Sequence, residues 1–222
     1  MKTDIQIQED VIEQLKWEPA IDAAGIGVGV KNGVVTLSGK VDTYLKKILA
    51  EKAARKVAGV RAVAEDIQVG PLPGYQRTDT EIAEAAVNSL NWNSNVPDEK
   101  ISIKVDDGVV TLEGEVKYNF QRVAAREAVE KLYGVVRVNN FITVLPGAAK
   151  EDVEKKIMAA FHRSASLDAY KIKVEVSGDT VILKGNVRSF AESEDAAGAA
   201  WAAPGVTHVD NRLVIDAREL VF

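Results

Sequence analysis

The stretch NGVVTLSGKV, from Asn32 to Val41, recurs 75 residues later as DGVVTLEGEV, from Asp107 to Val116. A looser third version, GDTVILKGNV, runs from Gly178 to Val187. All three keep Val-x-Leu-x-Gly-x-Val in the same places. Self-similarity of this kind indicates repeated structural units. The chain therefore contains three copies of one small domain, called here copies 1, 2 and 3.

Each copy has one pair of glycines at equivalent positions, separated by 20 residues: Gly39 and Gly59, Gly114 and Gly134, Gly185 and Gly205. Because Val35, Leu37 and Gly39 alternate along one strand, we expect Gly39 on the buried side. There it would let a helix approach closely, or let the strand bend as it leaves the sheet. All six glycines are predicted to be structural.

The residues around these glycines predict the secondary structure of each copy. Alternating apolar residues before the repeat, such as Ile26, Val28 and Val30, favour a strand, and Asn-Gly then favours a tight hairpin. The segment between the two glycines predicts an amphipathic helix, with Leu45, Leu49, Ala53 and Val57 on its apolar face and a third strand after it. Another helix opens each copy.

The predicted fold is α+β, with three tandem αββαβ domains. Each domain should form a three-stranded mixed sheet covered on one face by two helices, because a strand–helix–strand crossover is normally right-handed and parallel. The predicted domain ranges are 1–70, 77–146 and 148–218. The segment from Val69 to Thr78, with two prolines, is expected to be a semi-stiff spacer.

Composition excludes several functions. The net charge of −5, distributed as 0, −3 and −2 over the three copies, argues against a nucleic-acid partner. No apolar run is long enough for a transmembrane segment, and the N-terminus lacks the apolar core of an export signal. We therefore expect a cytoplasmic protein, or a periplasmic one if an export signal has been removed. The absence of cysteine excludes disulfides and thiolate metal sites.

At the Val-x-Leu-x-Gly-x-Val strand and the later Gly-Val, the chain resembles the BON domain family, and the resemblance covers essentially the whole chain. It implies a non-enzymatic bacterial protein, of the transport-associated and osmotically induced type. It further implies binding of a phospholipid surface or a hydrophobic ligand in osmotic or other stress. The positions on which the resemblance rests belong to the framework of the domain and are not a catalytic signature.

A candidate lipid-binding surface is the basic second helix of copy 1, with Lys46, Lys47, Lys52, Arg55 and Lys56. Basic side chains are attracted to anionic phospholipid headgroups. The alternative is an ordinary solvated helix face. Because copy 1 is neutral while the other copies are negative, anionic phospholipid is expected to bind through copy 1.

A second set of candidates is the tryptophans Trp17, Trp92 and Trp201, predicted to pack between repeats or against a partner. Trp17 and Trp92 hold equivalent positions, at which copy 3 has Arg163. The second helix of copy 3 is rich in alanine, which suggests docking on another repeat or another chain. The alternative is a degenerate copy with a core filled by Phe161, Phe190 or Trp201. A protein-interaction module that forms a homo-oligomer is therefore the second functional reading.

Catalytic chemistry has little support in the sequence. The two histidines, His162 and His208, hold non-equivalent positions and have no matching serine or carboxylate motif. We therefore predict no enzyme, no catalytic residue, no cofactor and no metal site. A small-ligand or cation sensor, with potassium as the example that the resemblance supplies, is the third functional reading.

Overall fold

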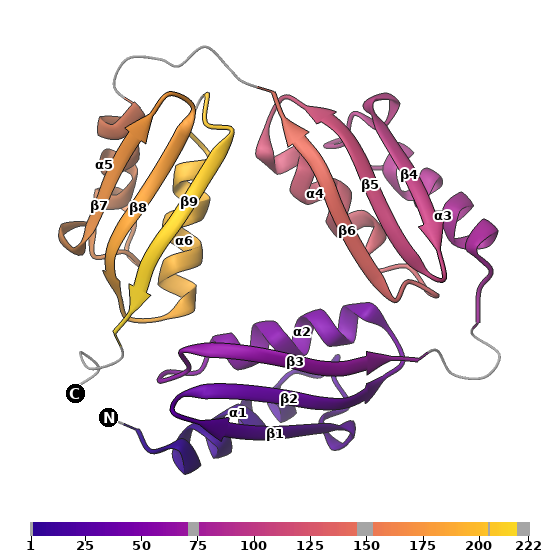
Figure 1. Cartoon of the computed structure of the whole chain (residues 1–222), viewed down its shortest axis with the longest axis horizontal. Helices are drawn as coiled ribbons and strands as arrows, with labels where there is room; N and C mark the ends of the chain where they lie inside the picture. Colours follow the sequence, from indigo (N-terminus) through magenta and orange to yellow (C-terminus); the bar gives the residue numbers. More distant parts are fainter. Residues whose placement is uncertain (1, 71–75, 146–152, 204, 217–222) are drawn as a thin grey trace.

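A computed structural model describes residues 2–70, 76–145, 153–203 and 205–216, and they form three domains (Figure 1). Each domain is an αββαβ unit with a three-stranded mixed sheet, so the predicted fold is confirmed. Residues 71–75, which belong to the predicted spacer between Val69 and Thr78, lie outside the described residues. Residues 146–152, between copies 2 and 3, lie outside them as well.

The three copies have the same order of elements. Copy 1 consists of α1 (Asp4–Trp17), the short helix η1 (Ala23–Gly25), β1 (Ile26–Lys31), β2 (Val34–Val41), α2 (Tyr44–Arg55) and β3 (Ala62–Val69). Copy 2 consists of α3 (Asp79–Asn91), η2 (Asp98–Lys100), β4 (Ile101–Asp106), β5 (Val109–Val116), α4 (Asn119–Val129) and β6 (Arg137–Val144). Copy 3 consists of α5 (Val153–Arg163), η3 (Ala169–Lys171), β7 (Ile172–Ser177), β8 (Thr180–Val187), α6 (Phe190–Trp201) and β9 (His208–Ile215).

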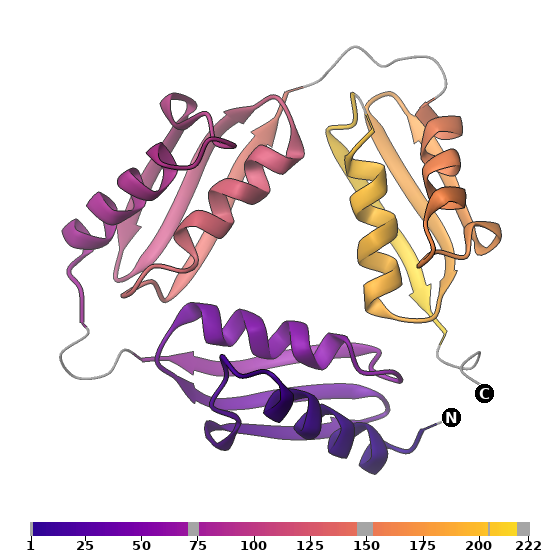
Figure 2. The same ribbon diagram turned by 180° about the vertical axis from the view of Figure 1, so that it is seen from behind.

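Sheet topology is the same in every copy. The first two strands pair antiparallel across the hairpin, and the second strand pairs parallel with the third after the helical crossover. The repeated glycine lies opposite the first residue of the first strand, as in the pair Ile26 and Gly39. Both helices cover one face of the sheet (Figure 2).

Each copy has its own hydrophobic core between helices and sheet. In copy 1 the core joins Leu37 of β2 to Leu15 of α1 and the alanines Ala50, Ala53 and Ala54 of α2. Of the predicted apolar face of α2, Ala53 and Val57 are buried, and Leu49 is half-buried and packs against this core. The fully buried positions of this helix hold small residues, which allow its backbone to lie close to the sheet.

The repeated strand glycine has a backbone conformation that other residues rarely adopt. Gly39, Gly114 and Gly185 have φ angles of +124°, +144° and +126°, in a region that side chains disfavour. A Cβ atom at Gly114 would collide with the carbonyl oxygen of Lys100, just before β4. The expectation that Gly39 is buried is wrong, since this residue is exposed, and the close neighbour is a backbone carbonyl and not a helix.

The second glycine of each pair ends the turn after the second helix. Gly59, Gly134 and Gly205 have φ angles of +98°, +89° and +87°, as expected where a left-handed residue follows a helix. The side chain of Ile7 lies where a Cβ atom of Gly59 would point. Both glycine positions therefore have a structural reason in every copy.

A carboxylate at the start of the first helix holds the hairpin turn in copies 1 and 2. Asp4 accepts hydrogen bonds from the backbone N–H groups of Asn32 (2.7 Å) and Gly33 (3.0 Å). Asp79 accepts the equivalent bonds from Asp107 and Gly108, both at 2.9 Å. Charge-assisted bonds of this kind fix the first helix to the β-hairpin.

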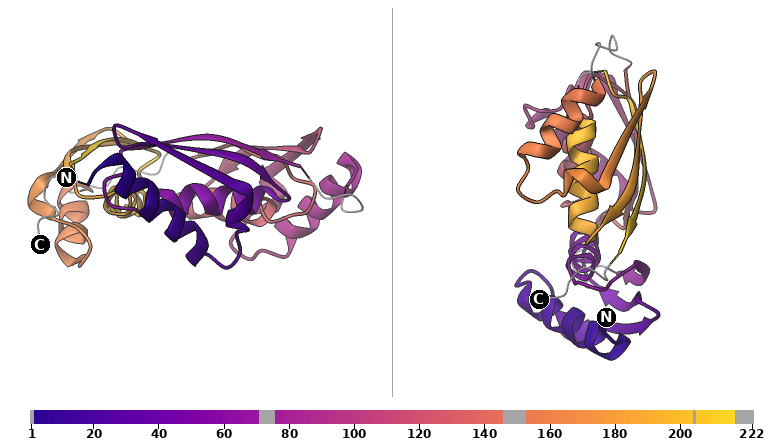
Figure 3. Two further views of the ribbon diagram at one scale, coloured as in Figure 1. Left: turned by 90° about the horizontal axis from the view of Figure 1, so that it is seen from below. Right: turned by 90° about the vertical axis from the view of Figure 1, so that its left-hand side faces the viewer.

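The three domains are arranged around a common centre, with the second helices α2, α4 and α6 on the inner side (Figures 1 and 2). The first helices α1, α3 and α5 lie farther out. Within the described residues, the helices α1 to α6 are on one broad face of the molecule and the sheets are on the other (Figures 2 and 3). The molecule therefore has a helical face and a sheet face.

Candidate functional site

Grooves lie at the outer corners of copies 1 and 3, between the end of the first helix and the short helix that follows it. The groove of copy 1 has a volume of 380 Å³ and is lined by Ile12, Leu15, Lys16, Ile21, Asp22, Ala23, Ala24 and Ile26. The groove of copy 3 has a volume of 580 Å³ and is lined by Glu154, Met158, His162, Ala169, Tyr170, Lys171, Ile172, Lys173, Val174, Lys184 and Gly185.

The two grooves share equivalent residues of the repeat, although the groove of copy 3 also extends along α5 and onto β7 and β8. Counted back from Gly39 and Gly185, Ile12 corresponds to Met158, and Lys16 corresponds to His162. Each groove therefore has an apolar residue and a nitrogen-bearing side chain on consecutive turns of the first helix. The ammonium of Lys16 is paired with the carboxylate of Glu13 at 2.8 Å.

Exposed aromatic side chains stand at this corner in all three copies. Trp17 at the end of α1 is 83% exposed, Trp92 at the end of α3 is 90% exposed, and Tyr170 in η3 is 92% exposed. The ring of Tyr170 makes an edge-to-face contact with His162, at 5.4 Å between ring centres. Each of these rings is free to contact a partner or a membrane, with an apolar body and a polar N–H or O–H group. We call these three positions the aromatic corners.

Charges beside the corner of copy 3 are largely paired. Lys184 and Lys173 lie 2.6 and 2.9 Å from the carboxylate of Glu175, and Lys171 lies 3.5 Å from Asp168. Hydrogen bonds from Lys184 and then Lys173 lower the pKa of Glu175 to about 2. The groove thus has an apolar floor and a nearly neutral polar rim.

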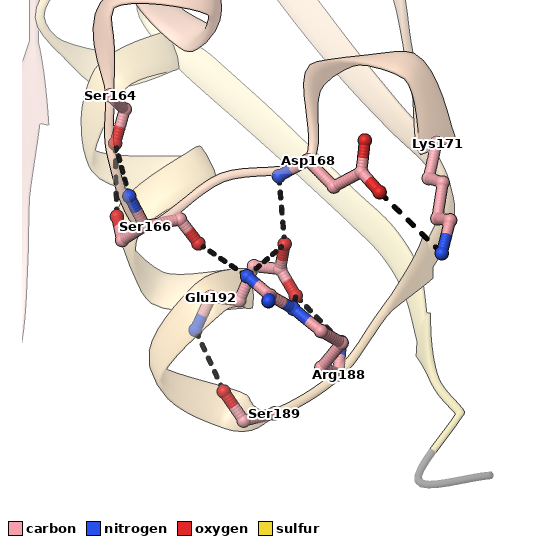
Figure 4. A network of polar contacts seen from close by, with 7 residues as sticks. All are labelled: Ser164, Ser166, Asp168, Lys171, Arg188, Ser189 and Glu192. Atoms are coloured by element: carbon pink, nitrogen blue, oxygen red, sulfur yellow. Dashed lines mark hydrogen bonds and ion pairs between the residues drawn. The ribbon is translucent and has the colours of Figure 1, made fainter. Parts of the chain in front are cut away.

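A polar network fixes the short helix that carries Tyr170 (Figure 4). The buried carboxylate of Glu192 in α6 accepts hydrogen bonds from the backbone N–H groups of Asp168 (2.9 Å) and Arg188 (2.6 Å). The guanidinium of Arg188 donates to Glu192 and to the carbonyl oxygen of Ser166 (3.0 Å). Burial opposes ionisation of Glu192, but these bonds outweigh it and lower its pKa.

The predicted basic surface of α2 is mostly engaged in ion pairs. Lys46 pairs with Asp42 at 2.8 Å, and Arg55 pairs with Glu51 at 2.6 Å. Lys47 lies 3.7 Å from Glu65 and donates to the carbonyl oxygen of Ile67. Burial raises the pKa of Glu65, which Lys47 partly counteracts. The remaining two basic residues of the set, Lys52 and Lys56, are exposed.

The three predicted packing tryptophans separate into two groups. Trp17 and Trp92 project from the outer corners. Trp201, at the end of α6, is half-buried against the core of copy 3, and the guanidinium of Arg122 from copy 2 lies 4.6 Å above its ring. Trp201 is therefore the one of the three that the structure places between repeats.

The histidines are not brought together. His162 lines the groove of copy 3, and His208 contacts the hydroxyl of Thr207 at 3.0 Å. Among the described residues no group of three or more histidine, cysteine or acidic side chains could hold a metal ion. Sequence reasoning missed Tyr170, because its corner becomes visible only when η3 folds beside the end of α5.

Comparison with known proteins gives a family match to most of the chain. A family model described as BON domain matches residues 3–71, 78–146 and 149–217. The chain is 31% identical over 125 residues to the osmotically-inducible protein Y of Escherichia coli strain K12. That alignment covers 54% of this chain and 62% of the relative, which is less than two thirds of the relative's length.

Two solved structures of CdsD, a structural protein of the type III secretion system of Chlamydia trachomatis, also align with the chain. The first is its C-terminal domain, with 14% identity, a TM-score of 0.27, and coverage of 97% of this chain and 100% of that chain. The second has 15% identity, a TM-score of 0.25, and coverage of 94% and 91%. Within the described ranges of our structure, no helix has the length and hydropathy needed to cross a membrane.

Proposed function

The chain belongs to the BON domain family, and on that basis we propose that it is a non-enzymatic binding protein of osmotic or related stress that attaches to a phospholipid surface. The relative in Escherichia coli is named for osmotic induction, which supports the stress context. The observation that carries the lipid proposal is the pair of equivalent tryptophans, Trp17 and Trp92, both more than four-fifths exposed.

Tryptophan and tyrosine side chains favour the headgroup level of a bilayer, because their rings are apolar at one end and polar at the other. An exposed tryptophan at the same corner of two copies, with tyrosine at that corner of the third, fits this role. In copies 1 and 3 the groove behind the aromatic residue offers apolar surface to part of a lipid. In this proposal, the aromatic corners are the residues that contact the membrane.

The proposal is tested by co-sedimentation of the full chain with large vesicles of phosphatidylglycerol and phosphatidylcholine. The wild-type protein should sediment with the vesicles, and its tryptophan emission should shift to shorter wavelength. The double change Trp17→Ala and Trp92→Ala should lower the bound fraction severalfold. A protein that stays in solution at every lipid concentration contradicts the proposal.

Phe141→Ala is the matched control. Phe141 is 63% exposed on β6, and its neighbour Ile142 is buried beneath the helices, so Phe141 points from the sheet face. The control removes an exposed aromatic side chain from the opposite broad face. It should leave vesicle binding unchanged, whereas an equal loss for the control and the corner variants would mean that binding is not specific to the helical face.

A further inference from the structure

The three copies contact each other through equivalent parts of their second helices. Tyr44, the first residue of α2, packs against the core of copy 2. Phe190, the first residue of α6, packs against the core of copy 1. Tyr44 and Phe190 both lie five residues after the repeated strand glycine, so two copies use the same position to contact the next copy.

The residues that are contacted at the ends of the second helices also hold equivalent positions in the repeat. The ring of Phe190 lies 5.1 Å from the guanidinium of Arg55, and Arg122 of α4 lies 4.6 Å above the ring of Trp201. Arg55 and Trp201 both lie sixteen residues after the strand glycine. The beginning of one second helix therefore meets the end of the next, from copy 1 to copy 2, from 2 to 3, and from 3 back to 1.

Head-to-tail contacts of this kind form a ring when the rotation between units closes. Here closure occurs within one chain, because copy 3 returns to copy 1 (Figure 2). Glu194 of α6 adds an ion pair to Arg55 at 3.7 Å, beside the contact of Phe190. These side chains join copies 1 and 3 without a covalent link.

Closure also sets how the three first helices are placed relative to one another. The first helices, which end at Trp17, Trp92 and Arg163, occupy three outer positions on the single helical face (Figures 2 and 3). In the closed ring, the first helices of all three copies lie on the same broad face of the molecule (Figures 2 and 3).

We infer that the ring is a three-point clamp for an extended bilayer, which binds all three aromatic corners at once, and not a receptor for individual lipid molecules. This inference rests on the proposed function. Linked sites raise overall affinity because the second and third contacts become intramolecular, by factors of about 10² to 10⁴ without any new contact. The gain requires that all three corners can reach one surface together.

The test opens the ring in the full chain by Phe190→Ala with Glu194→Arg, which removes the aromatic contact and places a second positive charge beside Arg55. Small-angle scattering should show a larger radius of gyration, while circular dichroism shows retained secondary structure. Phe141→Ala is again the control, because Phe141 is an exposed aromatic residue on β6 and does not belong to a second helix.

Affinity for large phosphatidylglycerol–phosphatidylcholine vesicles should fall at least tenfold in the opened variant and stay unchanged in the control. Affinity for a soluble short-chain phosphatidylglycerol should be equal in the open and closed proteins. Single changes Trp17→Ala, Trp92→Ala and Tyr170→Ala should each weaken vesicle binding severalfold.

The other outcomes separate the two proposals. If the wild-type protein ignores vesicles, the proposed function fails. If the opened protein binds vesicles as tightly as the wild type, or if only one of the three aromatic changes matters, the clamp is wrong while lipid binding stands. A ring that stays closed after the double change also overturns the inference, because closure was assigned to these contacts.

Discussion

The guanidinium of Arg55 in copy 1 lies over the ring of Phe190 in copy 3, with 5.1 Å between its central carbon and the ring centre. The same guanidinium pairs with Glu51 of its own helix and with Glu194 of α6. A cation over an aromatic face is attracted by the ring electrons, and partial desolvation strengthens that attraction. Arg55 therefore connects the first and last domains of the chain.

Replacing the glycine of the middle copy tests whether this strand position requires glycine. Gly114→Val should destabilise copy 2 by about 1–3 kcal/mol, because φ is +144° and the carbonyl of Lys100 occupies the space of a Cβ atom. Hydrogen exchange resolved by mass spectrometry can locate the loss in copy 2. Gly29→Ala is the control, since no atom lies within 4 Å of its added Cβ. Unchanged protection in Gly114→Val would contradict the described backbone.

The ionised carboxylate of Glu192 should stabilise copy 3 in a pH-dependent way. Its pKa is lowered on folding, so the unfolded chain binds more protons between the folded pKa and the ordinary value of about 4.3. The stabilisation is therefore fully present above the ordinary value and is lost as the pH falls through the folded value.

Glu192→Gln should accordingly cost about 1–3 kcal/mol at neutral pH, since it weakens charge-assisted bonds to the backbone N–H groups of Asp168 and Arg188. The difference from the wild type should shrink in acid, as measured by denaturant unfolding across the pH range. Asp195→Asn, on an exposed position of the same helix, is the control. A pH-independent difference would assign the loss to packing and not to charge.

Gly198 offers a stabilising substitution in α6. It is exposed, lies inside the helix, and has no atom within 4 Å of an added Cβ. Gly198→Ala should raise stability by about 0.5–1 kcal/mol, because alanine loses less backbone entropy in a helix than glycine does. Thermal unfolding of both proteins measures the change. Gly205→Ala, at a φ of +87°, should have the opposite sign.

The basic surface of α2 remains a prediction with its own test. Lys52 and Lys56 are exposed, whereas Lys46, Lys47 and Arg55 are paired with carboxylates. Changing Lys52 and Lys56 to glutamine should weaken binding to anionic vesicles at low salt, by up to about 1 kcal/mol per residue, and have no effect at high salt. A loss larger than that of the Trp17 and Trp92 variant would move the lipid contact to α2.

Much of the fold follows from local sequence. The strand repeat, the hairpin residues Asn32 and Gly33, and the glycine pairs predicted the order of elements in every copy, because turns and periodicity depend on neighbouring residues. The structural reason why residue 39 must be glycine was not predictable in this way. A positive φ and a nearby carbonyl arise from how the end of η1 approaches β2, which the linear sequence does not display.

Sequence by itself determined three αββαβ domains and pointed to Trp17 and Trp92 as equivalent residues. Only tertiary structure decided that these two are exposed while Trp201 lies between repeats, since exposure depends on what packs nearby. It also placed Tyr170 at the third corner and brought Phe190 onto Arg55. Those relationships join residues far apart in the chain, and side-chain contacts between separately folded domains leave no periodic signal in either segment.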